Sequence, residues 1–269
     1  MNTSLGKHFF ARKPEVVARD LLGKILVRQV RGQLGSMLLA GRIVETEAYL
    51  ATGDPACHAS RGMTRKNSTM FERAGLVYVY AIHARHCLNV VTEREGKPSA
   101  VLIRAIEPLV GLASMAQHRG IDLPGADAGE SRNSERGQFL TPDRAPQFPL
   151  KLLRDLARGP GRLCQALAID RSLDKHDLLL GSQLWITESL ESLVSLASPL
   201  CANSPLAPRV TSAVRARHAP NARHSATNCA FARSPRIGVT SAQDMLLRYY
   251  LRDSLFLSGT HKFNRTEWE

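Results

Sequence analysis

Two glutamates and a tyrosine alternate in the segment RIVETEAYL, and their chemical types could support hydrolysis. In a β-strand the side chains of Glu45, Glu47 and Tyr49 would share one face, because successive side chains point to opposite faces. A carboxylate beside an aromatic ring can activate a water next to a flat ligand stacked on that ring. The alternative interpretation is the solvated edge of a strand, in which the glutamates have no catalytic role.

A second aromatic pair lies in the segment LVYVYAI, directly before a basic turn. Tyr78 and Tyr80 alternate in this segment, and His83, Arg85 and His86 follow it. A tyrosine pair in a strand commonly packs in the core or on a sheet face. Aromatic side chains close to a basic turn can instead stack on bases or enter a duplex. The pair is therefore a candidate contact for nucleic acid.

Arg104 interrupts the otherwise apolar segment VLIRAIEP. A buried arginine needs an anion or carbonyl oxygens as partners, because an unpaired charge is costly to bury. We therefore expect Arg104 to pair with Glu47. A purely structural ion pair would satisfy the same requirement, so the sequence leaves both roles open.

The apolar pattern indicates which elements position these residues. Residues 15–30 begin with helical spacing and end as an alternating strand, with Gly23 as the expected helix stop. Further strands are expected within residues 36–50, 76–82 and 99–109, and the last should open into a helix near Pro108 to Gln117.

Two stretches differ in composition from the rest of the chain. Residues 118–150 are dense in Gly, Pro, Asp and Arg without a helical or strand period, which predicts a long surface loop. Residues 192–243 contain no acidic residue, and the part from 200 to 233 has a bias typical of a flexible insertion. The arginines of this segment are Arg209, Arg215, Arg217, Arg223, Arg233 and Arg236.

The whole chain has an ordinary globular composition with a basic excess. Its 269 residues include 36 Lys plus Arg against 24 Asp plus Glu, a formal net charge of +12, and 43% are hydrophobic. Wholesale disorder is thereby excluded, and a polyanionic partner is favoured because Lys and Arg can neutralise phosphates. No apolar run suits a membrane span, and MNTSLGKHFFARK lacks a signal core. We expect a cytoplasmic or nuclear protein that is not secreted.

The cysteines are scattered and odd in number: Cys57, Cys87, Cys164, Cys201 and Cys229. Neither a CxxC pair nor a close Cys/His ligand spacing is present, which argues against a disulfide framework and against a structural zinc site. Reduced thiols, mostly buried, are expected.

Taken in order, these motifs resemble the alkyladenine/3-methyladenine DNA glycosylase family. The resemblance runs through FFARKPEVVARDLLGKILVR, GRIVETEAYL, DPACHAS, LVYVYAI, CLNVV, VLIRAIEPLVG, GPGRLCQALAID and SPRIGV. RIVETEAY and GPGRLCQAL are its most specific parts. It implies a single α+β domain over residues 1–269, with a curved antiparallel β-sheet surrounded by helices, a protruding β-hairpin and insertions at 118–150 and 200–233.

The resemblance also implies a DNA repair enzyme that flips out alkylated or deaminated purines and hydrolyses their N-glycosidic bond, leaving an abasic site. Glu47 matches the family's catalytic carboxylate, the general base for a water that attacks C1′. Arg104 matches the arginine that helps to hold this water, together with a main-chain carbonyl that maps near Val239. The family is monofunctional and uses no metal or nucleotide cofactor, so neither is expected here.

Other residues match the pocket and DNA-binding positions of the family. Tyr49, His58 and Tyr80 match the residues that enclose the flipped base. Asn89 matches the asparagine that obstructs the exocyclic amino group of normal guanine, and Arg162 matches a position near DNA that is usually basic.

Two segments depart from the family pattern. At the hairpin tip the family has a Tyr that fills the gap left by the flipped base, whereas this chain has His83 followed by Ala84 and Arg85. We expect His83 to be a weaker wedge and Arg85 to add backbone contacts. In the loop MTRKNSTMF, Arg65 and Lys66 are candidates for phosphate contact, with a solvated charge cluster as the alternative.

Three other functions are compatible with parts of the sequence: a DNA-binding protein that keeps the fold without catalysis, a basic RNA-associated protein, and a metal-dependent hydrolase. Catalysis is favoured by the joint presence of Glu47, Arg104, Tyr49, His58 and Tyr80. A protein that only binds DNA needs no buried carboxylate facing the DNA, because its charge would repel the phosphate backbone. The expected partner is double-stranded DNA containing damaged purines, bound by a monomer without a membrane or an obligate protein partner.

Overall fold

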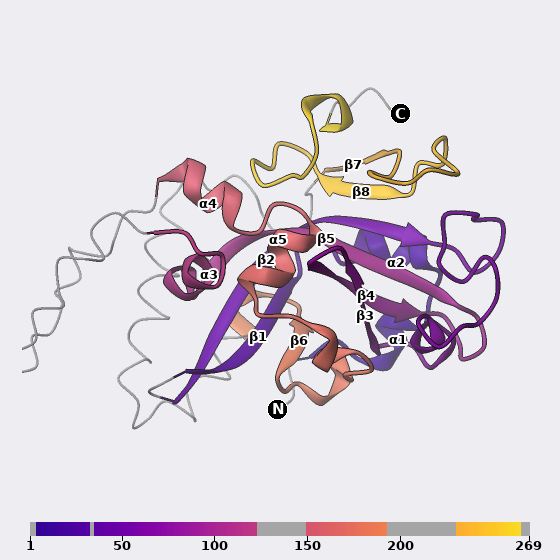
Figure 1. The fold of residues 1–269 in the computed structure, drawn as a ribbon, viewed down its shortest axis with the longest axis horizontal. Helices are drawn as coiled ribbons and strands as arrows, with labels where there is room; N and C mark the ends of the chain where they lie inside the picture. Colours follow the sequence, from indigo (N-terminus) through magenta and orange to yellow (C-terminus); the bar gives the residue numbers. More distant parts are fainter. Residues whose placement is uncertain (1–3, 33–34, 123–148, 193–229, 265–269) are drawn as a thin grey trace, which may run out of the picture.

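A single antiparallel β-sheet organises the protein. The computed structural model describes residues 4–32, 35–122, 149–192 and 230–264. Within them, eight strands form one sheet in the order β3-β4-β5-β2-β1-β6, with β8 paired to β2 and β7 to β8 (Figure 1). The strands are β1 (Ile25–Gly32), β2 (Gly35–Tyr49), β3 (Val77–Ile82), β4 (Arg85–Thr92), β5 (Ser99–Val110), β6 (Leu184–Thr187), β7 (Phe231–Ser234) and β8 (Arg248–Leu251). The predicted α+β fold is confirmed.

Short helices pack against this sheet. They are α1 (Lys7–Phe10), α2 (Pro14–Asp20), α3 (Leu112–His118), α4 (Leu150–Leu156) and α5 (Pro160–Ala166), with 3₁₀ turns at η1 (Ser68–Phe71), η4 (Arg171–Leu173), η5 (Leu178–Leu180) and η6 (His261–Asn264). Both α2 and α5 begin with a proline, whose fixed φ suits the first helical position. Helix α2 contacts β2 and β5, whereas α5 contacts β4 and β5, and the main hydrophobic core lies between these elements.

Strand β2 crosses the centre of the sheet and carries the two glutamates. Along one edge it pairs with β5. Along its other edge it pairs first with β1, over residues 35–42, and then with β8, over Glu45 to Glu47. Because β2 has a neighbour on both edges at this point, Glu45 and Glu47 are fully buried rather than lying on a solvated strand edge.

A β-bulge places Arg104 opposite these glutamates. In the register of β2 with β5, Glu45 pairs with Ala105 and Thr46 pairs with Ile103, so Arg104 has no direct partner on β2. A bulge of this kind inserts an extra residue and changes the direction of a side chain, and it is common beside active sites. The bulge explains how an arginine is accommodated in an apolar central strand.

The predicted hairpin is formed by β3 and β4. Its register pairs Tyr78 with Asn89, Tyr80 with Cys87 and Ile82 with Arg85, leaving a two-residue turn. The residues 81–85 around this turn are exposed, whereas the base of the hairpin is buried.

Two boundaries differ from the sequence-based expectations. The helix expected from Pro108 begins at Leu112, because β5 continues to Val110 and Gly111 then adopts a left-handed conformation. The insertion expected at 200–233 ends too late, since Phe231–Ser234 forms β7. Most of this insertion, and residues 123–148 of the stretch 118–150, lie outside the described residues. The helix stop at Gly23 is confirmed by its φ of 85° between α2 and β1.

Candidate active site

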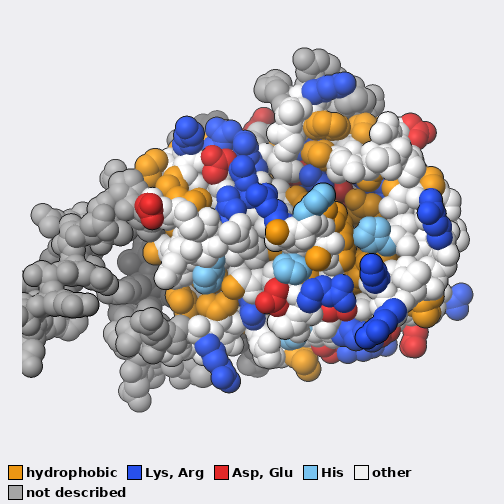
Figure 2. Space-filling view, viewed as in Figure 1, with side chains coloured by type: hydrophobic (Ala, Val, Ile, Leu, Met, Phe, Trp, Pro, Cys, Tyr) orange, Lys and Arg blue, Asp and Glu red, His pale blue; other side chains and the backbone are white. Residues whose placement is uncertain are grey.

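A pocket of about 610 Å³ opens between the loop after β2, the β3–β4 hairpin and the segment before β8. Figure 2 shows hydrophobic and histidine side chains gathered on this face, with lysines and arginines around them. Every residue that the sequence assigned to the base pocket lines it: Tyr49, His58, Tyr80, Asn89 and Val239, together with Arg104. A cavity of this size suits a small flat ligand.

Glu47 lies behind the wall of this pocket, where it accepts two hydrogen bonds and forms one ion pair. Its Oε1 is 2.7 Å from the backbone nitrogen of Ile237 and 3.1 Å from Nη1 of Arg104. Its Oε2 is 3.0 Å from the hydroxyl of Tyr49. A carboxylate has about four acceptor positions, so about one remains after these contacts. These three partners belong to residues that line the pocket, so they hold the carboxylate directly behind its wall.

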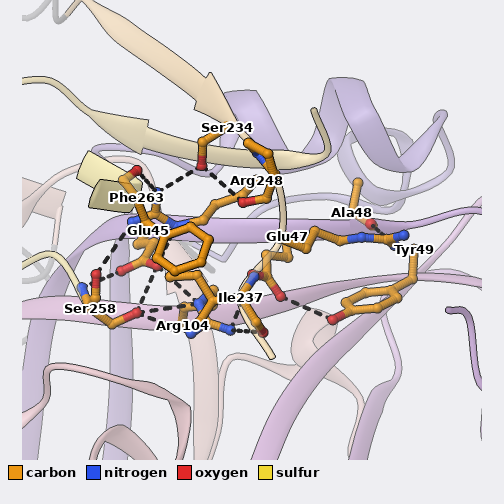
Figure 3. Close-up of polar contacts among 12 residues, drawn as sticks. Glu45, Glu47, Ala48, Tyr49, Arg104, Ser234, Ile237, Arg248, Ser258 and Phe263 are labelled. Atoms are coloured by element: carbon orange, nitrogen blue, oxygen red, sulfur yellow. Dashed lines mark hydrogen bonds and ion pairs between the residues drawn. The ribbon is translucent and has the colours of Figure 1, made fainter. Parts of the chain in front are cut away.

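Arg104 links both glutamates, as the sequence predicted for Glu47 (Figure 3). Its Nε is 2.9 Å from Oε1 of Glu45, while its Nη1 reaches Glu47. Burial alone would lower the pKa of Arg104, but the negative charges of Glu47 and Glu45 raise it instead. Arg104 therefore stays charged between the two carboxylates.

Glu47, Arg104, Glu45 and Arg248 form a row of buried charges, and Glu45 lies between the two arginines. Its Oε1 also accepts a hydrogen bond from Nε of Arg248 at 2.7 Å, and its Oε2 accepts one from the backbone nitrogen of Ser258 at 2.6 Å. Arg248 is itself fully buried and donates to Ser234 Oγ at 2.9 Å and to the carbonyl of Phe263 at 2.8 Å (Figure 3). Because Arg248 spans β7, β8 and η6, Glu45 ties the C-terminal elements to the strand that carries Glu47.

Tyr49 is held on both sides by charged groups. Burial and the negative charge of Glu47 raise its pKa, so the hydroxyl remains protonated and donates to that carboxylate. The guanidinium of Arg236 lies 4.6 Å from the centre of the tyrosine ring. Arg236 is also paired in a bidentate contact with buried Asp54, at 2.6 and 2.7 Å. Arg236 therefore supports the pocket and does not belong to a solvent-exposed basic segment.

Three aromatic rings that line the pocket pack against one another. The ring of His58 lies 4.4 Å from that of Tyr80, and the rings of Tyr78 and Tyr80 are 5.5 Å apart. His58 Nδ1 is 3.0 Å from the hydroxyl of Tyr78, whose pKa is raised to about 12 by burial. Partial burial lowers the pKa of His58, which favours the neutral imidazole at neutral pH.

Asn89 lies at the base of the hairpin with its orientation fixed. It is buried, and its Nδ2 donates to the carbonyl of Tyr78 at 3.1 Å. Because the amide nitrogen is used within the hairpin, the amide oxygen remains as an acceptor. Asn89 is thus a rigid polar group beside the aromatic rings of the pocket.

The basic loop is organised by a buried asparagine. Asn67 accepts a hydrogen bond from the backbone nitrogen of Thr64 at 2.6 Å and donates to the carbonyl of His58 at 2.9 Å. These contacts tie the loop to the pocket and leave Arg65 and Lys66 exposed. Arg61, which the sequence analysis did not single out, lines the pocket itself.

The remaining DNA-contact candidates lie at the hairpin tip and on α5. His83 and Arg85 are exposed, and His83 has a φ of 53° in the turn. The side chain of Arg85 extends over Gly161, where an added Cβ would lie 2.7 Å from Arg85 Cδ. Arg162 follows on α5 and contacts Asp155 at 3.1 Å, so part of its charge is balanced within the protein.

Sequence reasoning missed the backbone of Ile237. Its nitrogen contacts Glu47, and its carbonyl is 3.5 Å from Nη1 of Arg104. Val239 lines the same pocket, but its carbonyl accepts a hydrogen bond from Gln243 at 3.0 Å. No side-chain pattern could have identified Ile237, because its contacts are made by the backbone. Tyr78, in contrast, could have been assigned from its alternation with Tyr80.

A second cavity, of about 470 Å³, lies between α2 and β7 and shares no lining residue with the first. Among the described residues, no group of three or more His, Cys, Asp or Glu side chains could hold a metal ion. Within the same part of the chain, no helix has the length and apolar character needed to cross a membrane.

Comparison with known proteins identifies the family. A family model described as methylpurine-DNA glycosylase matches residues 8–199. A protein of Herpetosiphon aurantiacus is 43% identical over 272 residues, which cover 98% of this chain and 93% of that protein. A protein of Rhodopirellula baltica is 36% identical over 262 residues, or 97% and 86% of the two chains. Both relatives carry the provisional name 3-methyladenine DNA glycosylase. The chain belongs to the methylpurine-DNA glycosylase family.

Proposed function

We propose that this protein is a monofunctional DNA glycosylase that releases alkylated purines, such as 3-methyladenine, or deaminated purines from double-stranded DNA. The observation that carries the proposal is the position of Glu47, held by Tyr49, Arg104 and Ile237 directly behind the wall of a pocket that contains aromatic side chains. A base inside a duplex cannot reach such a pocket, so the target nucleotide must be extruded.

In this mechanism Glu47 acts as the general base. Its remaining acceptor position takes a hydrogen bond from a water, which attacks C1′ of the extruded nucleotide as the N-glycosidic bond breaks. The proton of the water passes to Glu47, the purine leaves with the bonding electrons, and the sugar keeps a hydroxyl at C1′. The carboxylate also stabilises the positive charge that develops on the sugar. Arg104 keeps Glu47 in this orientation through the 3.1 Å contact.

Selectivity for alkylated purines follows from the pocket walls. Alkylation at N3 or N7 leaves a cationic purine, which is a good leaving group and is attracted to the faces of tyrosine rings. Tyr49 and Tyr80 supply such faces, and a neutral His58 adds no repelling charge. A weakly paired damaged base is also less costly to extrude than a normal one.

The alternative function is DNA binding without catalysis. It needs neither the row of buried charges from Arg248 to Glu47 nor a pocket at the end of that row. The experiment that separates the two is incubation of the protein with methylated duplex DNA, followed by measurement of free bases, abasic sites and strand breaks. We expect released bases, 3-methyladenine among them, and abasic sites in equal total amounts, with unbroken strands and no effect of EDTA. The absence of any released base would contradict the proposal.

The salt dependence of DNA binding provides a separate prediction. Residues 200–229 contain four arginines and no acidic residue, so their deletion removes a third of the net charge of +12 while leaving β7 in place. We expect the slope of log affinity against log salt to become shallower, by about 0.9 for each phosphate contact that is lost. Base release at saturating protein should persist. An unchanged slope would show that these arginines do not contact DNA.

A further inference from the structure

The guanidinium of Arg236 covers one face of the Tyr49 ring. Its carbon Cζ lies 4.6 Å from the centre of that ring. The side chain of Arg236 is fully buried and does not line the pocket, whereas Tyr49 does. A flat ligand in the pocket can therefore stack on Tyr49 only at the face that Arg236 leaves open.

Arg236 is held rigidly in this position. Its Nη1 and Nη2 donate to the two carboxylate oxygens of Asp54, at 2.6 and 2.7 Å, and Nη1 also donates to the carbonyl of Ala48 at 3.0 Å. Asp54 is fixed in turn, because its oxygens accept hydrogen bonds from the backbone nitrogens of Leu50 and Ala56. Burial alone would lower the pKa of Arg236, but the hydrogen bond and the charge of Asp54 raise it, so the guanidinium remains charged.

The two tyrosines that flank the pocket differ in this respect. Among the described residues, a guanidinium lies over the rings of Phe9, Tyr49 and Tyr250, and only Tyr49 of these three lines the pocket. The ring of Tyr80 packs instead against the rings of His58 and Tyr78. Tyr49 is thus the pocket ring whose electrostatic character is altered by a buried cation.

A cation behind an aromatic ring changes what the open face attracts. The negative face of a tyrosine ring attracts cations, but one face of Tyr49 is already used by a guanidinium. A cationic purine on the open face would be repelled by the like charge behind the ring. A neutral purine has no net charge to be repelled, and it keeps its stacking with the ring.

We propose that Arg236 is a specificity-determining residue that acts through Tyr49 and favours neutral purines over cationic ones at its open face. Tyr80, which has no guanidinium over its ring, supplies the attraction for a cationic purine. The two rings together let one pocket accept both alkylated and deaminated purines. This inference rests on the proposed function, since it requires an extruded base in contact with Tyr49.

The test compares two duplexes that differ in the charge of the target base. One contains 7-methylguanine, which is cationic, and the other contains hypoxanthine, which is neutral. A 2′-fluoro group on the sugar of each target nucleotide slows hydrolysis, so that binding is measured without base release. The readout is the ratio of the two affinities. The cost of extruding each base belongs to the DNA, so it cancels when the ratio of a variant is compared with that of the wild type.

The double variant Arg236→Gln/Asp54→Asn removes both charges of the pair and keeps amide groups in their place. We expect its ratio to shift toward 7-methylguanine by about three- to tenfold, the size of one cation–π contact. Asp54→Asn alone leaves the charge of Arg236 without its balancing carboxylate, so its ratio should shift the opposite way, toward hypoxanthine.

The matched control is Arg73→Gln/Asp177→Asn, which should keep the wild-type ratio. Arg73 and Asp177 form a similar bidentate pair, at 2.6 and 3.4 Å, and neither residue lines the pocket. If the first double variant does not fold, the direction of the shift in Asp54→Asn decides alone. A shift toward hypoxanthine supports the inference, and an unchanged ratio or a shift toward 7-methylguanine contradicts it.

Three further results would overturn the role of Arg236. The first is a wild type that binds neither duplex more tightly than an undamaged one. The second is a wild-type ratio in Arg236→Gln/Asp54→Asn. The third is a shift in the same direction in this variant and in Asp54→Asn, which would show that the pair acts by holding the ring and not by charge. If the ratios shift as expected but the wild type releases no base from unmodified duplexes, the proposed function is refuted and the role of Arg236 stands.

Discussion

Replacement of Arg104 by methionine is expected to lower the free energy of unfolding by about 3–5 kcal/mol, the usual cost of removing one partner from a buried ion pair. Arg104 is the only described group that contacts both Glu45 and Glu47 through ion pairs. Without it, Glu47 loses its ion-pair partner and Glu45 keeps only its pair with Arg248. Denaturant unfolding of the two proteins measures the loss.

A double variant separates this electrostatic effect from a packing defect. Adding Glu47→Gln to Arg104→Met removes one of the two carboxylates and leaves the Glu45–Arg248 pair balanced. We therefore expect the double variant to be more stable than Arg104→Met alone, although neither should release bases. Additive destabilisation by the two substitutions would indicate that Arg104 stabilises the protein by packing and not by charge.

Glu45→Gln is expected to destabilise the protein by a similar amount, about 3–5 kcal/mol, because it leaves Arg248 buried without a carboxylate. Glu45 does not line the pocket, and Glu47 keeps its contacts with Tyr49 and Ile237 in this variant. Base release per folded molecule should therefore fall less than in Glu47→Gln. If Glu45→Gln has wild-type stability, Glu45 is not the anchor of the C-terminal elements.

The same residue gives stability a dependence on pH. Burial alone would raise the pKa of Glu45, but the charges of Arg104 and Arg248 and the hydrogen bond from Ser258 hold it below the ordinary value of 4.5. A pKa that is lower in the folded state stabilises the protein above the ordinary pKa, and this contribution is lost as pH falls through the lowered value. The wild type should therefore lose stability in acid more steeply than Glu45→Gln, as measured by unfolding between about pH 5 and pH 2. Parallel pH profiles would contradict the role of the pair.

Side-chain alternation made much of the site predictable from the sequence. Glu45, Glu47 and Tyr49 were expected on one face of a strand, and Glu47 and Tyr49 are in contact in the structure. The pairing of Arg104 with Glu47 followed from the cost of burying an arginine among apolar residues, and it is confirmed. These inferences depend on the alternation of side chains along a strand and on the need of a buried arginine for an anionic partner. Both can be recognised directly in a sequence.

Other parts of the site depend on contacts between distant segments, which a single sequence does not reveal. Arg248 reaches Glu45 across 203 positions, and the backbone of Ile237 reaches Glu47 across 190. Arg236 lies in an arginine-rich stretch and was grouped with the basic charge there. Its pairing with Asp54, 182 positions away, makes it a buried support of Tyr49. The net charge is thus a poor guide to which arginines can contact DNA.

The exposed tip of the hairpin illustrates a different limit of sequence patterns. The turn was expected to present His83 as the wedge, because His83 occupies the position at which the resembling family has an aromatic residue. The register of β3 with β4 shows that Ile82, one position earlier, lies on the pocket face. Alternation places Ile82 on the same face as Tyr78 and Tyr80, whereas the register shows where the strand ends and leaves His83 in the two-residue turn. The role of His83 as the wedge stays a prediction.

The rate of base release by Glu47→Gln tests the central claim most directly. The measurement is the single-turnover release of 3-methyladenine from methylated duplex DNA, with enzyme in excess, by the wild type and by Glu47→Gln. Loss of a general base predicts a decrease of roughly 10²- to 10⁴-fold in Glu47→Gln. Its affinity for a duplex that carries a tetrahydrofuran abasic-site analogue should remain, because Glu47 lies behind the pocket wall. Equal rates of release by the two proteins would show that Glu47 does not activate the water.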